Sequence, residues 1–293
     1  MAERTIISIG GGELRERTTL KIDEYIAGRA KARAGIRRAN ALFLPTASHD
    51  FMPYYNTFHK VYTGVFDIKT DVALCVFKDA DLARMREKFE KADMIYAGGG
   101  DTVFMIEQWK KTGLLPLIRE AYERGVVICG LSAGAICWFS DMYTDSATAA
   151  ATAAAASESS AAADMTAGSD MDSAAGLAGT VAAGLAGTVA AVSVGTVAAV
   201  SAAAASENAE KYSMFPGLGW IKGKISPHYG ARMVDFDKIL CYNNGSAYGL
   251  EDNSAILIEN ETVRGAISSG GTAWKIESAD GELKKSAVEL ISI

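Results

Sequence analysis

Cysteine and histidine are both scarce in this sequence of 293 residues. Its four cysteines, Cys75, Cys129, Cys137 and Cys241, stand far apart, and neither they nor the three histidines show the spacing of metal ligands. Cys75 and Cys129 lie in apolar, strand-like runs, which is typical of buried, reduced thiols. We therefore expect a cytoplasmic protein without a metal site.

Clustered positive charge is also missing. The 29 lysines and arginines are scattered among 35 aspartates and glutamates, and the net charge is −6. A surface that binds nucleic acid would need a basic face. The segment Met1–Ile9 lacks the apolar stretch that begins a secreted protein. We expect a monomer or a homodimer that binds neither nucleic acid nor a membrane.

The two glycine patterns that identify nucleotide sites, Gly-x-x-x-x-Gly-Lys and Gly-x-Gly-x-x-Gly, do not occur. The triplet Gly98–Gly100, followed by Asp101 and Thr102, keeps two simple interpretations. It is either a phosphate-binding turn or a strand-to-helix connection with an N-cap. We expect no cofactor.

Short apolar runs alternate with amphipathic stretches through the first half of the chain, which is the pattern of βαβ units around a mostly parallel sheet. The expected strands are Thr5–Ile9, Ala41–Leu44, Asp71–Val76, Met94–Ala97 and Val126–Leu131. The expected helices are Leu20–Ala34, Leu82–Phe89 and Phe104–Lys111. Ligands of such sheets bind beyond the carboxyl ends of the strands. Gly10–Gly12, Gly98–Gly100 and Ser132 all fall at that edge.

After Ile225 the sequence predicts short strands that are separated by turn pairs. A helix at about Val234–Cys241 interrupts them. The expected strands are Ala247–Leu250, Ala255–Glu259, Thr262–Ala266 and Ala273–Ile276. We expect hairpins that extend or flank the main sheet.

Residues 146–210 fit neither pattern. They are dominated by Ala, Ser, Gly, Thr and Val, with near-repeats eight residues apart. A membrane span is disfavoured because these residues supply little transfer energy. We interpret the stretch as a low-complexity insert, looped out of one catalytic α/β domain that consists of residues 1–145 and 211–293.

A nucleophile motif follows the fifth expected strand. Gly130, Ser132 and Gly134 fit Gly-x-Ser-x-Gly, with an apolar strand before the motif and a helix-compatible run after it. So tight a turn needs small neighbours and lifts the hydroxyl clear of the sheet. Ser132 is therefore the candidate nucleophile of a serine hydrolase.

A serine hydroxyl needs a base, and three histidines are available. His228 is the candidate because it directly follows an expected strand, in the run Ser226–Tyr229. His49 and His59 lie in an expected loop and helix near the same sheet edge. Ordinary surface or hydrogen-bonding roles are the simpler interpretation for those two.

The third group would be a carboxylate that fixes the tautomer of the imidazole. Asp145 is preferred because it follows the nucleophile and precedes the histidine in the chain. Asp141, Glu251 and Asp252 remain alternatives.

Backbone amides must also meet the negative charge that develops on the reacting carbonyl oxygen. The candidate donors are Ala133 and Gly99, since glycine lets the main chain approach a substrate closely. An acidic substrate would need a cation as well, and Arg232 stands four residues after His228. A surface arginine is the alternative interpretation.

Taken together, five motifs in this order resemble the peptidase E-like serine peptidases, the relatives of aspartyl dipeptidase and cyanophycinase. The motifs cover nearly all of the chain except the Ala-rich stretch. They are Ile7–Gly12, Leu42–Ser48, Ile95–Thr102, Gly130–Phe139 and Pro216–Gly219 with Ser226–Tyr229. The resemblance implies a flavodoxin-like, mostly parallel sheet with helices on both faces, as in class I glutamine amidotransferases, and extra C-terminal β-hairpins.

The same resemblance implies hydrolysis of a short peptide next to an acidic residue, through an acyl-enzyme and without a cofactor. It places the nucleophile on Ser132, the base on His228, the oxyanion donors on Gly99 and Ala133, and the acid near Asp145. The Ala-rich stretch departs from the family, because it begins directly after the expected acid.

Two other functions stay open at this point. An insert that displaced the acid would leave a binding or scaffold protein with the same fold. An α/β-hydrolase esterase shares the Gly-x-Ser-x-Gly motif and the chain order, but it would want a His-Gly-Gly loop and a histidine close to the end of the chain; this sequence has neither.

Overall fold

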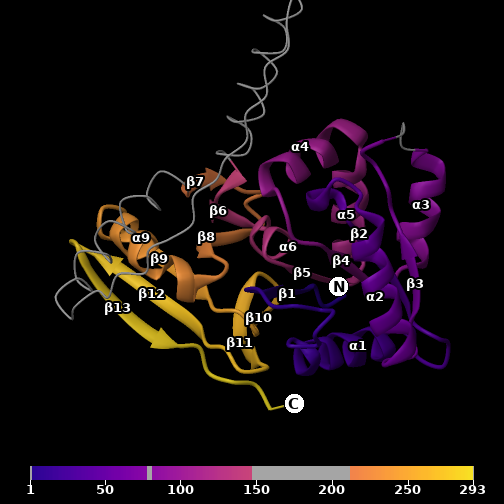
Figure 1. Cartoon of the computed structure of the whole chain (residues 1–293), viewed down its shortest axis with the longest axis horizontal. Helices are drawn as coiled ribbons and strands as arrows, with labels where there is room; N and C mark the ends of the chain where they lie inside the picture. The colour runs from indigo at the N-terminus through magenta and orange to yellow at the C-terminus, as the bar shows by residue number, and fades with distance from the viewer. Residues whose placement is uncertain (1, 78–80, 147–211, 293) are drawn as a thin grey trace, which may run out of the picture.

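The computed structural model describes residues 2–77, 81–146 and 212–292. These residues form two β-sheets, and each sheet contains strands from both sides of the undescribed stretch (Figure 1). Apart from Ser146, the expected insert lies outside the described residues. Of the described helices, none combines the length and the apolar character that crossing a membrane requires.

The larger sheet has seven strands in the order β11-β10-β1-β5-β4-β2-β3. Strands β1 to β5 run parallel, and β10 and β11 add an antiparallel hairpin beside β1. The bounds are Thr5–Ile9 (β1), Asn40–Leu44 (β2), Lys69–Val72 (β3), Met94–Ala97 (β4), Val127–Leu131 (β5), Ser254–Glu259 (β10) and Thr262–Ser268 (β11).

Alternate side chains of these parallel strands pack into two separate apolar layers. Ile6 and Leu42 pack with the helices of one face, whereas Ile7 and Phe43 pack with those of the other. The first face carries α3 (Leu82–Lys91), α4 (Thr102–Thr112), α5 (Leu114–Glu123) and α6 (Ala133–Ile136), and the second carries α1 (Leu20–Ala34) and α2 (Met52–Gly64). Helices on both faces of a mostly parallel sheet confirm the predicted fold class.

The smaller sheet has six strands in the order β13-β12-β9-β8-β6-β7, and α9 packs on it (Figure 1). The bounds are Phe139–Thr144 (β6), Ser213–Pro216 (β7), Ile221–Ser226 (β8), Tyr229–Cys241 (α9), Gly245–Leu250 (β9), Ala273–Ala279 (β12) and Glu282–Ala287 (β13). Strands β6, β8 and β9 run parallel. The expected C-terminal hairpins therefore divide: only β10 and β11 extend the main sheet, while β12 and β13 complete a second one.

Strand β3 is displaced from its expected position, Asp71–Val76, and ends at Val72. The amides of Cys75 and Val76 donate instead to one carboxylate oxygen of Asp50, each at 2.7 Å. The Asp50 carboxylate, from the loop after β2, thus accepts the two amides that would otherwise pair with a neighbouring strand.

A buried carboxylate links α1 to α2. Asp23 accepts hydrogen bonds from the Thr19 hydroxyl at 2.7 Å and from the Tyr62 hydroxyl at 2.8 Å. Burial raises the pKa of Asp23 to about 6, because removal from water disfavours the charged form. Helix α2, which this contact helps to position, forms one wall of a hollow that Leu131 also lines.

This raised pKa predicts a stability that falls with rising pH. Between pH 4 and 6 the folded protein still holds the Asp23 proton, while the unfolded chain, with a pKa near 3.8, has lost it. The wild type should lose about 2 kcal/mol of unfolding free energy between about pH 4.5 and 7 that Asp23→Asn does not lose. Urea unfolding at both pH values measures this difference, and equal pH dependence in the two proteins would contradict the assignment.

Candidate active site

Ser132 occupies the turn between β5 and α6, with φ 53° and ψ −108°. Such a backbone costs of the order of 1–3 kcal/mol in a residue other than glycine, and it persists only where the surroundings fix it. Here the Ser132 amide donates to the carbonyl of Ile9, at the end of β1, at 3.0 Å. The serine is thus held at the carboxyl edge of the parallel sheet, as the sequence predicts.

The tightness of this turn explains the glycines on either side. A Cβ at Gly134 would clash with the carbonyl oxygen of Ala97, and one at Gly130 would clash with the carbonyl oxygen of Gly134. The Trp138 indole donates to the Gly134 carbonyl at 2.8 Å and fixes the next turn of the chain. The close approach of these backbone segments therefore requires glycine at both ends of the Gly-x-Ser-x-Gly motif.

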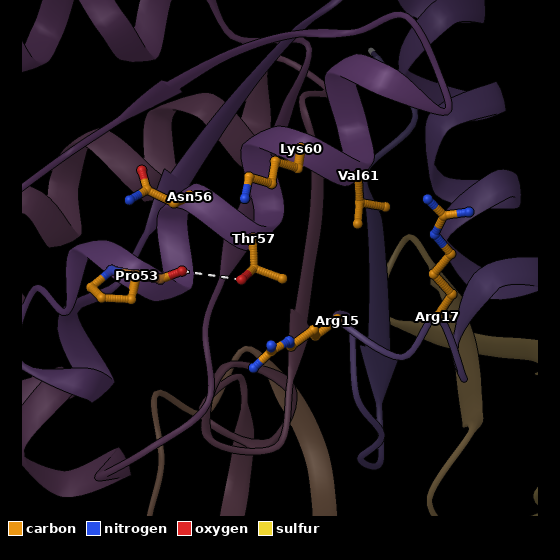
Figure 2. Close-up of a pocket in the computed structure, with 7 residues that line it drawn as sticks. All are labelled: Arg15, Arg17, Pro53, Asn56, Thr57, Lys60 and Val61. Atoms are coloured by element: carbon orange, nitrogen blue, oxygen red, sulfur yellow. Dashed lines mark hydrogen bonds between the residues drawn. The ribbon is translucent and has the colours of Figure 1, made fainter.

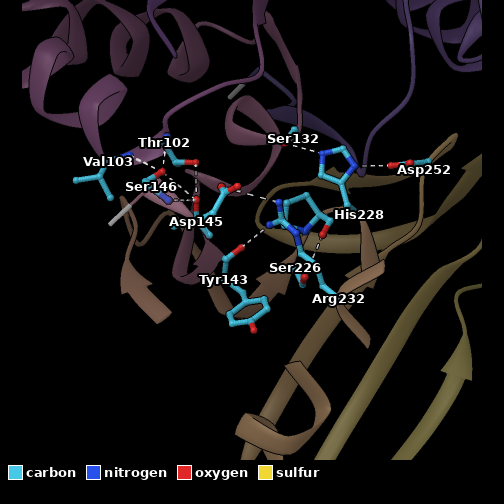
Figure 3. Close-up of polar contacts among 12 residues, drawn as sticks. Thr102, Val103, Ser132, Tyr143, Asp145, Ser146, Ser226, His228, Arg232 and Asp252 are labelled. Carbon is cyan, nitrogen blue, oxygen red and sulfur yellow. Dashed lines mark hydrogen bonds and ion pairs between the residues drawn. The ribbon is translucent and has the colours of Figure 1, made fainter. Parts of the chain in front are cut away.

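His228 follows β8 directly and meets Ser132 across 96 positions of sequence. Its Nε2 lies 3.0 Å from the Ser132 hydroxyl oxygen (Figure 3). The backbone of His228 is left-handed, with φ 49°, and its amide donates to the carbonyl of Gly10 at 3.0 Å. The imidazole is thus fixed from the main chain as well as through its ring.

The other ring nitrogen of His228 meets a carboxylate. Nδ1 lies 2.6 Å from Oδ1 of Asp252, in the turn between β9 and β10 (Figure 3). An ionised carboxylate only accepts hydrogen bonds, so Nδ1 carries the ring proton and donates it. In this neutral tautomer Nε2 has a free lone pair, which can accept a hydrogen bond from the Ser132 hydroxyl.

Gly11 makes room for this pair. A Cβ at position 11 would clash with the Asp252 carboxylate and with the His228 ring. The Gly11 carbonyl accepts the amide of Asn253 at 2.9 Å, which holds the Asp252 turn against the loop after β1.

Asp145, the carboxylate preferred from chain order, lies elsewhere. Its oxygen is 3.9 Å from Nη2 of Arg232, and the Arg232 guanidinium donates to the Tyr143 carbonyl at 3.2 Å (Figure 3). Asp145 ends up beside Arg232 because β6 and α9 bring the two together, whereas the His228 ring points toward the β9–β10 turn. Asp252, one of the open alternatives, holds the position that was expected for Asp145.

The remaining sequence candidates have other surroundings. Glu251 accepts from the Thr272 amide at 3.0 Å and from the Trp274 indole at 2.9 Å. Asp141 lies within β6. The His49 ring packs on Phe104, with centroids 4.1 Å apart, and His59 Nδ1 lies 2.6 Å from the Thr70 hydroxyl.

Gly99 and Ala133 flank the serine. A Cβ at Gly99 would lie 3.4 Å from Ser132 Cβ, so the two main chains are close. Ala133 begins α6, and a first helical residue has no acceptor for its amide inside the helix. The Gly99 amide donates to the Tyr54 hydroxyl at 3.3 Å. Burial raises the pKa of Tyr54 to about 12, so this hydroxyl keeps its proton at neutral pH.

The description of peptidase family S51 matches residues 6–172, which include Ser132, Gly99 and the loop after β1. The chain belongs to peptidase family S51. Among S51-like relatives, the uncharacterized peptidase YgaJ of Bacillus subtilis is 37% identical over 145 residues, which are 49% of this chain and 60% of YgaJ. The uncharacterized peptidase PM1590 of Pasteurella multocida is 32% identical over 107 residues, or 34% of this chain and 48% of PM1590. The matches thus span about half the length of these relatives.

Two solved structures share this fold. A peptidase from an acI-B1 actinobacterium superposes with a TM-score of 0.59 at 13% identity, over 99% of this chain and 95% of that one. A putative peptidase E protein from Listeria monocytogenes gives a TM-score of 0.51 at 15% identity, over 91% of this chain and 99% of that one. At these identities the likeness concerns the fold.

Two residues of this S51 site had no role in the sequence predictions. Tyr54 carries no local signal, because an aromatic residue in an amphipathic helix is typical of packing. Gly11 stood within the noted Gly10–Gly12 triplet, and only its contact with the imidazole and carboxylate distinguishes it. Asp252 was named, yet nothing in its local sequence ranks it above Asp145.

The steric account of the turn predicts that Gly134→Ala lowers the unfolding free energy by about 1–3 kcal/mol, since the added methyl group must displace the backbone of Ala97. Gly28→Ala is the matched control, because Gly28 lies on α1 with nothing within 4 Å of the added atom. That control should stabilise the protein by up to about 1 kcal/mol. Urea unfolding measures both, and equal shifts would refute the steric account.

Proposed function

We propose that this S51 family member is a serine peptidase of the peptidase E type, which cleaves short peptides through an acyl-enzyme on Ser132. The observation that carries the proposal is the continuous contact from the Ser132 hydroxyl through the His228 ring to the Asp252 carboxylate, at 3.0 and 2.6 Å. Side chains within hydrogen-bond reach in this order are what activation of a serine hydroxyl requires.

In the first half of the proposed reaction, the Ser132 oxygen attacks the peptide carbonyl while Nε2 of His228 takes the hydroxyl proton. Asp252 stabilises the imidazolium that forms. Nε2 then gives that proton to the leaving amine as the C–N bond breaks. In the second half, water attacks the acyl ester and His228 accepts a proton from that water. The C–O bond to Ser132 then breaks, His228 gives its proton back to the Ser132 oxygen, and the carboxylic acid product leaves.

The carbonyl oxygen becomes negatively charged in each half. We propose that the Ala133 and Gly99 amides stabilise it, because both adjoin Ser132. In the free protein the Gly99 amide donates to the Tyr54 hydroxyl, so Tyr54 is a positioning residue that holds this amide beside Ser132. We propose that the amide exchanges the hydroxyl for the oxyanion when the substrate reacts.

Arg232 remains the proposed cation for an acidic side chain of the substrate. It is only 7% exposed, and its guanidinium lies 4.4 Å from the centroid of the Tyr212 ring. The 3.9 Å distance to Asp145 is too long for a hydrogen bond, so this ion pair leaves guanidinium hydrogens for a substrate carboxylate.

The position of Asp252 favours a peptidase over a scaffold protein. Asp252 lies after the undescribed stretch and is held by the loop after β1, so the proposed relay does not use the carboxylate that adjoins residues 147–211. All four cysteines are free thiols, in keeping with the proposed cytoplasmic location. A reaction without metal or cofactor remains a prediction.

Substitution of the three aspartates considered as partners of His228 tests the proposal. Asp252→Asn should lower kcat by about 10⁴-fold, because an amide cannot hold the imidazole in the productive tautomer. Asp145→Asn should keep kcat within about tenfold, and Asp141→Asn should leave it unchanged. Initial rates on a panel of Asp-x, Glu-x and neutral dipeptides measure all three.

Ser132→Ala gives the lowest rate expected in this experiment, because it removes the nucleophile and should lower kcat by about 10⁴- to 10⁶-fold. Thermal unfolding of each variant confirms that it folds. A folded Asp252→Asn protein with wild-type rates, or an inactive Asp145→Asn protein beside an active Asp252→Asn one, would overturn the assignment of the relay.

A further inference from the structure

A hollow of about 440 Å³ lies against Leu131, between the loop after β1 and the first turns of α2. Its walls include Leu131, which directly precedes the serine, and Tyr54, whose hydroxyl contacts Gly99. Gly12, the next residue after the glycine that packs on the His228 ring, also lines it. The hollow therefore approaches the proposed reaction centre through Leu131 and Tyr54, although Ser132, His228 and Asp252 are not among its described lining residues.

A second hollow of about 430 Å³ continues from the first along α2. The two share Arg15, Pro53 and Thr57 in their walls. Figure 2 shows this second part, with Arg15 and Arg17 from the loop after β1 and Asn56, Thr57 and Lys60 from α2. We call the continuous depression the α2 groove; its near part adjoins Leu131, and its far part lies at Lys60.

The two parts of the α2 groove differ in charge. The near part carries the Glu13 carboxylate and the Arg15 guanidinium beside mainly apolar atoms. The far part is lined by Arg15, Arg17 and Lys60, and no carboxylate is among the described residues that line it.

These three cations are also unpaired. Within the described residues, none of Arg15, Arg17 and Lys60 makes an ion pair or a side-chain hydrogen bond. By contrast, Arg4 pairs with Glu261 at 2.6 Å. A local excess of positive charge around a hollow attracts an anion and can contact it from several sides.

The length of the groove sets the size of its occupant. From Pro53 to Lys60, α2 rises by roughly 10 Å at 1.5 Å per residue. An extended peptide covers that distance in about three residues, at about 3.3 Å each. A ligand that lies along α2 from Pro53 to Lys60 is thus about three residues long.

We propose that the α2 groove is an extended substrate subsite. It binds about three residues of a short peptide on one side of the cleaved bond, and its cations receive a carboxylate at the far end. The proposal rests on the proposed function of Ser132 and adds a substrate class: oligopeptides with a carboxylate about three residues from that bond. The carboxylate comes from the C-terminus of the peptide or from an acidic side chain.

Binding to the Ser132→Ala protein tests this without turnover. Three tetrapeptides are titrated by calorimetry: Asp-Leu-Ala-Ala as the free acid, the same peptide as its C-terminal amide, and Asp-Leu-Ala-Asp amide. We expect the first amide to bind about tenfold more weakly than the acid, as loss of several exposed charge contacts predicts. Recovery with the Asp amide identifies a side-chain carboxylate as sufficient; no recovery identifies the C-terminus.

Variants locate the effect in the groove. Arg17→Ala/Lys60→Ala, added to Ser132→Ala, should weaken binding of the free acid about tenfold and leave binding of the first amide unchanged. Lys110→Ala is the matched control, since Lys110 is an exposed lysine near the end of α4, away from the groove lining. It should change neither affinity. Equal binding of acid and amide, or an equal loss for both peptides in the double variant, would overturn the subsite.

Hydrolysis by the wild type separates this proposal from the previous one. A wild type that fails to cleave the free acid, although Ser132→Ala binds acid and amide with the expected difference, contradicts the peptidase and keeps the groove. Cleavage of acid and amide with the same KM contradicts the groove and keeps the peptidase.

Discussion

Three consecutive carbonyls at the end of β1 hold the proposed catalytic residues together. Ile9 accepts the amide of Ser132, Gly10 accepts that of His228, and Gly11 accepts that of Asn253, beside Asp252, at 2.9 to 3.0 Å. The three groups come from turns that are far apart in the chain. Strand β1 lies between β5 and β10 in the main sheet, and the three turns meet at its C-terminal end.

The loop after β1 contributes to both the proposed catalytic contacts and the proposed peptide groove. Its first residues, Gly10 and Gly11, fix the serine-histidine-aspartate contacts, and the absence of a side chain at Gly11 leaves space for the imidazole and the carboxylate. Its later residues, Arg15 and Arg17, turn toward α2 and line the hollow beside it. The loop after β1 thus shapes both the proposed Ser132–His228–Asp252 contacts and the α2 groove that we propose for the peptide.

The candidate residues that chain order and motifs single out are those whose positions depend on local structure. Ser132 follows from a strand, small neighbours and a helix start, and His228 follows from its place after a strand. The carboxylate depends on long-range pairing: Asp252 reaches the ring only because β10 pairs with β1, and chain order pointed to Asp145 instead.

The second sheet was not predicted, because its strands pair across long stretches of sequence. Helix α6 after Ser132 is only four residues long, and the aromatic run that follows it leads into β6, a strand of that second sheet. The shift of β3 depends on the side chain of Asp50, which comes from another loop and leaves no periodic signal. Helix α1 was predicted with its observed bounds and α3 and α4 to within two residues, whereas α9 begins five residues before its expected start and α5 was not predicted.

Reaction of the wild type with a fluorophosphonate, followed by mass spectrometry of the digested protein, tests most directly whether Ser132 is an activated nucleophile. The account predicts one adduct, on the peptide that contains Ser132, and labelling at least about 100-fold slower in a folded His228→Ala protein. A folded wild type that stays unlabelled, or labelling at the same rate without the imidazole, would contradict it.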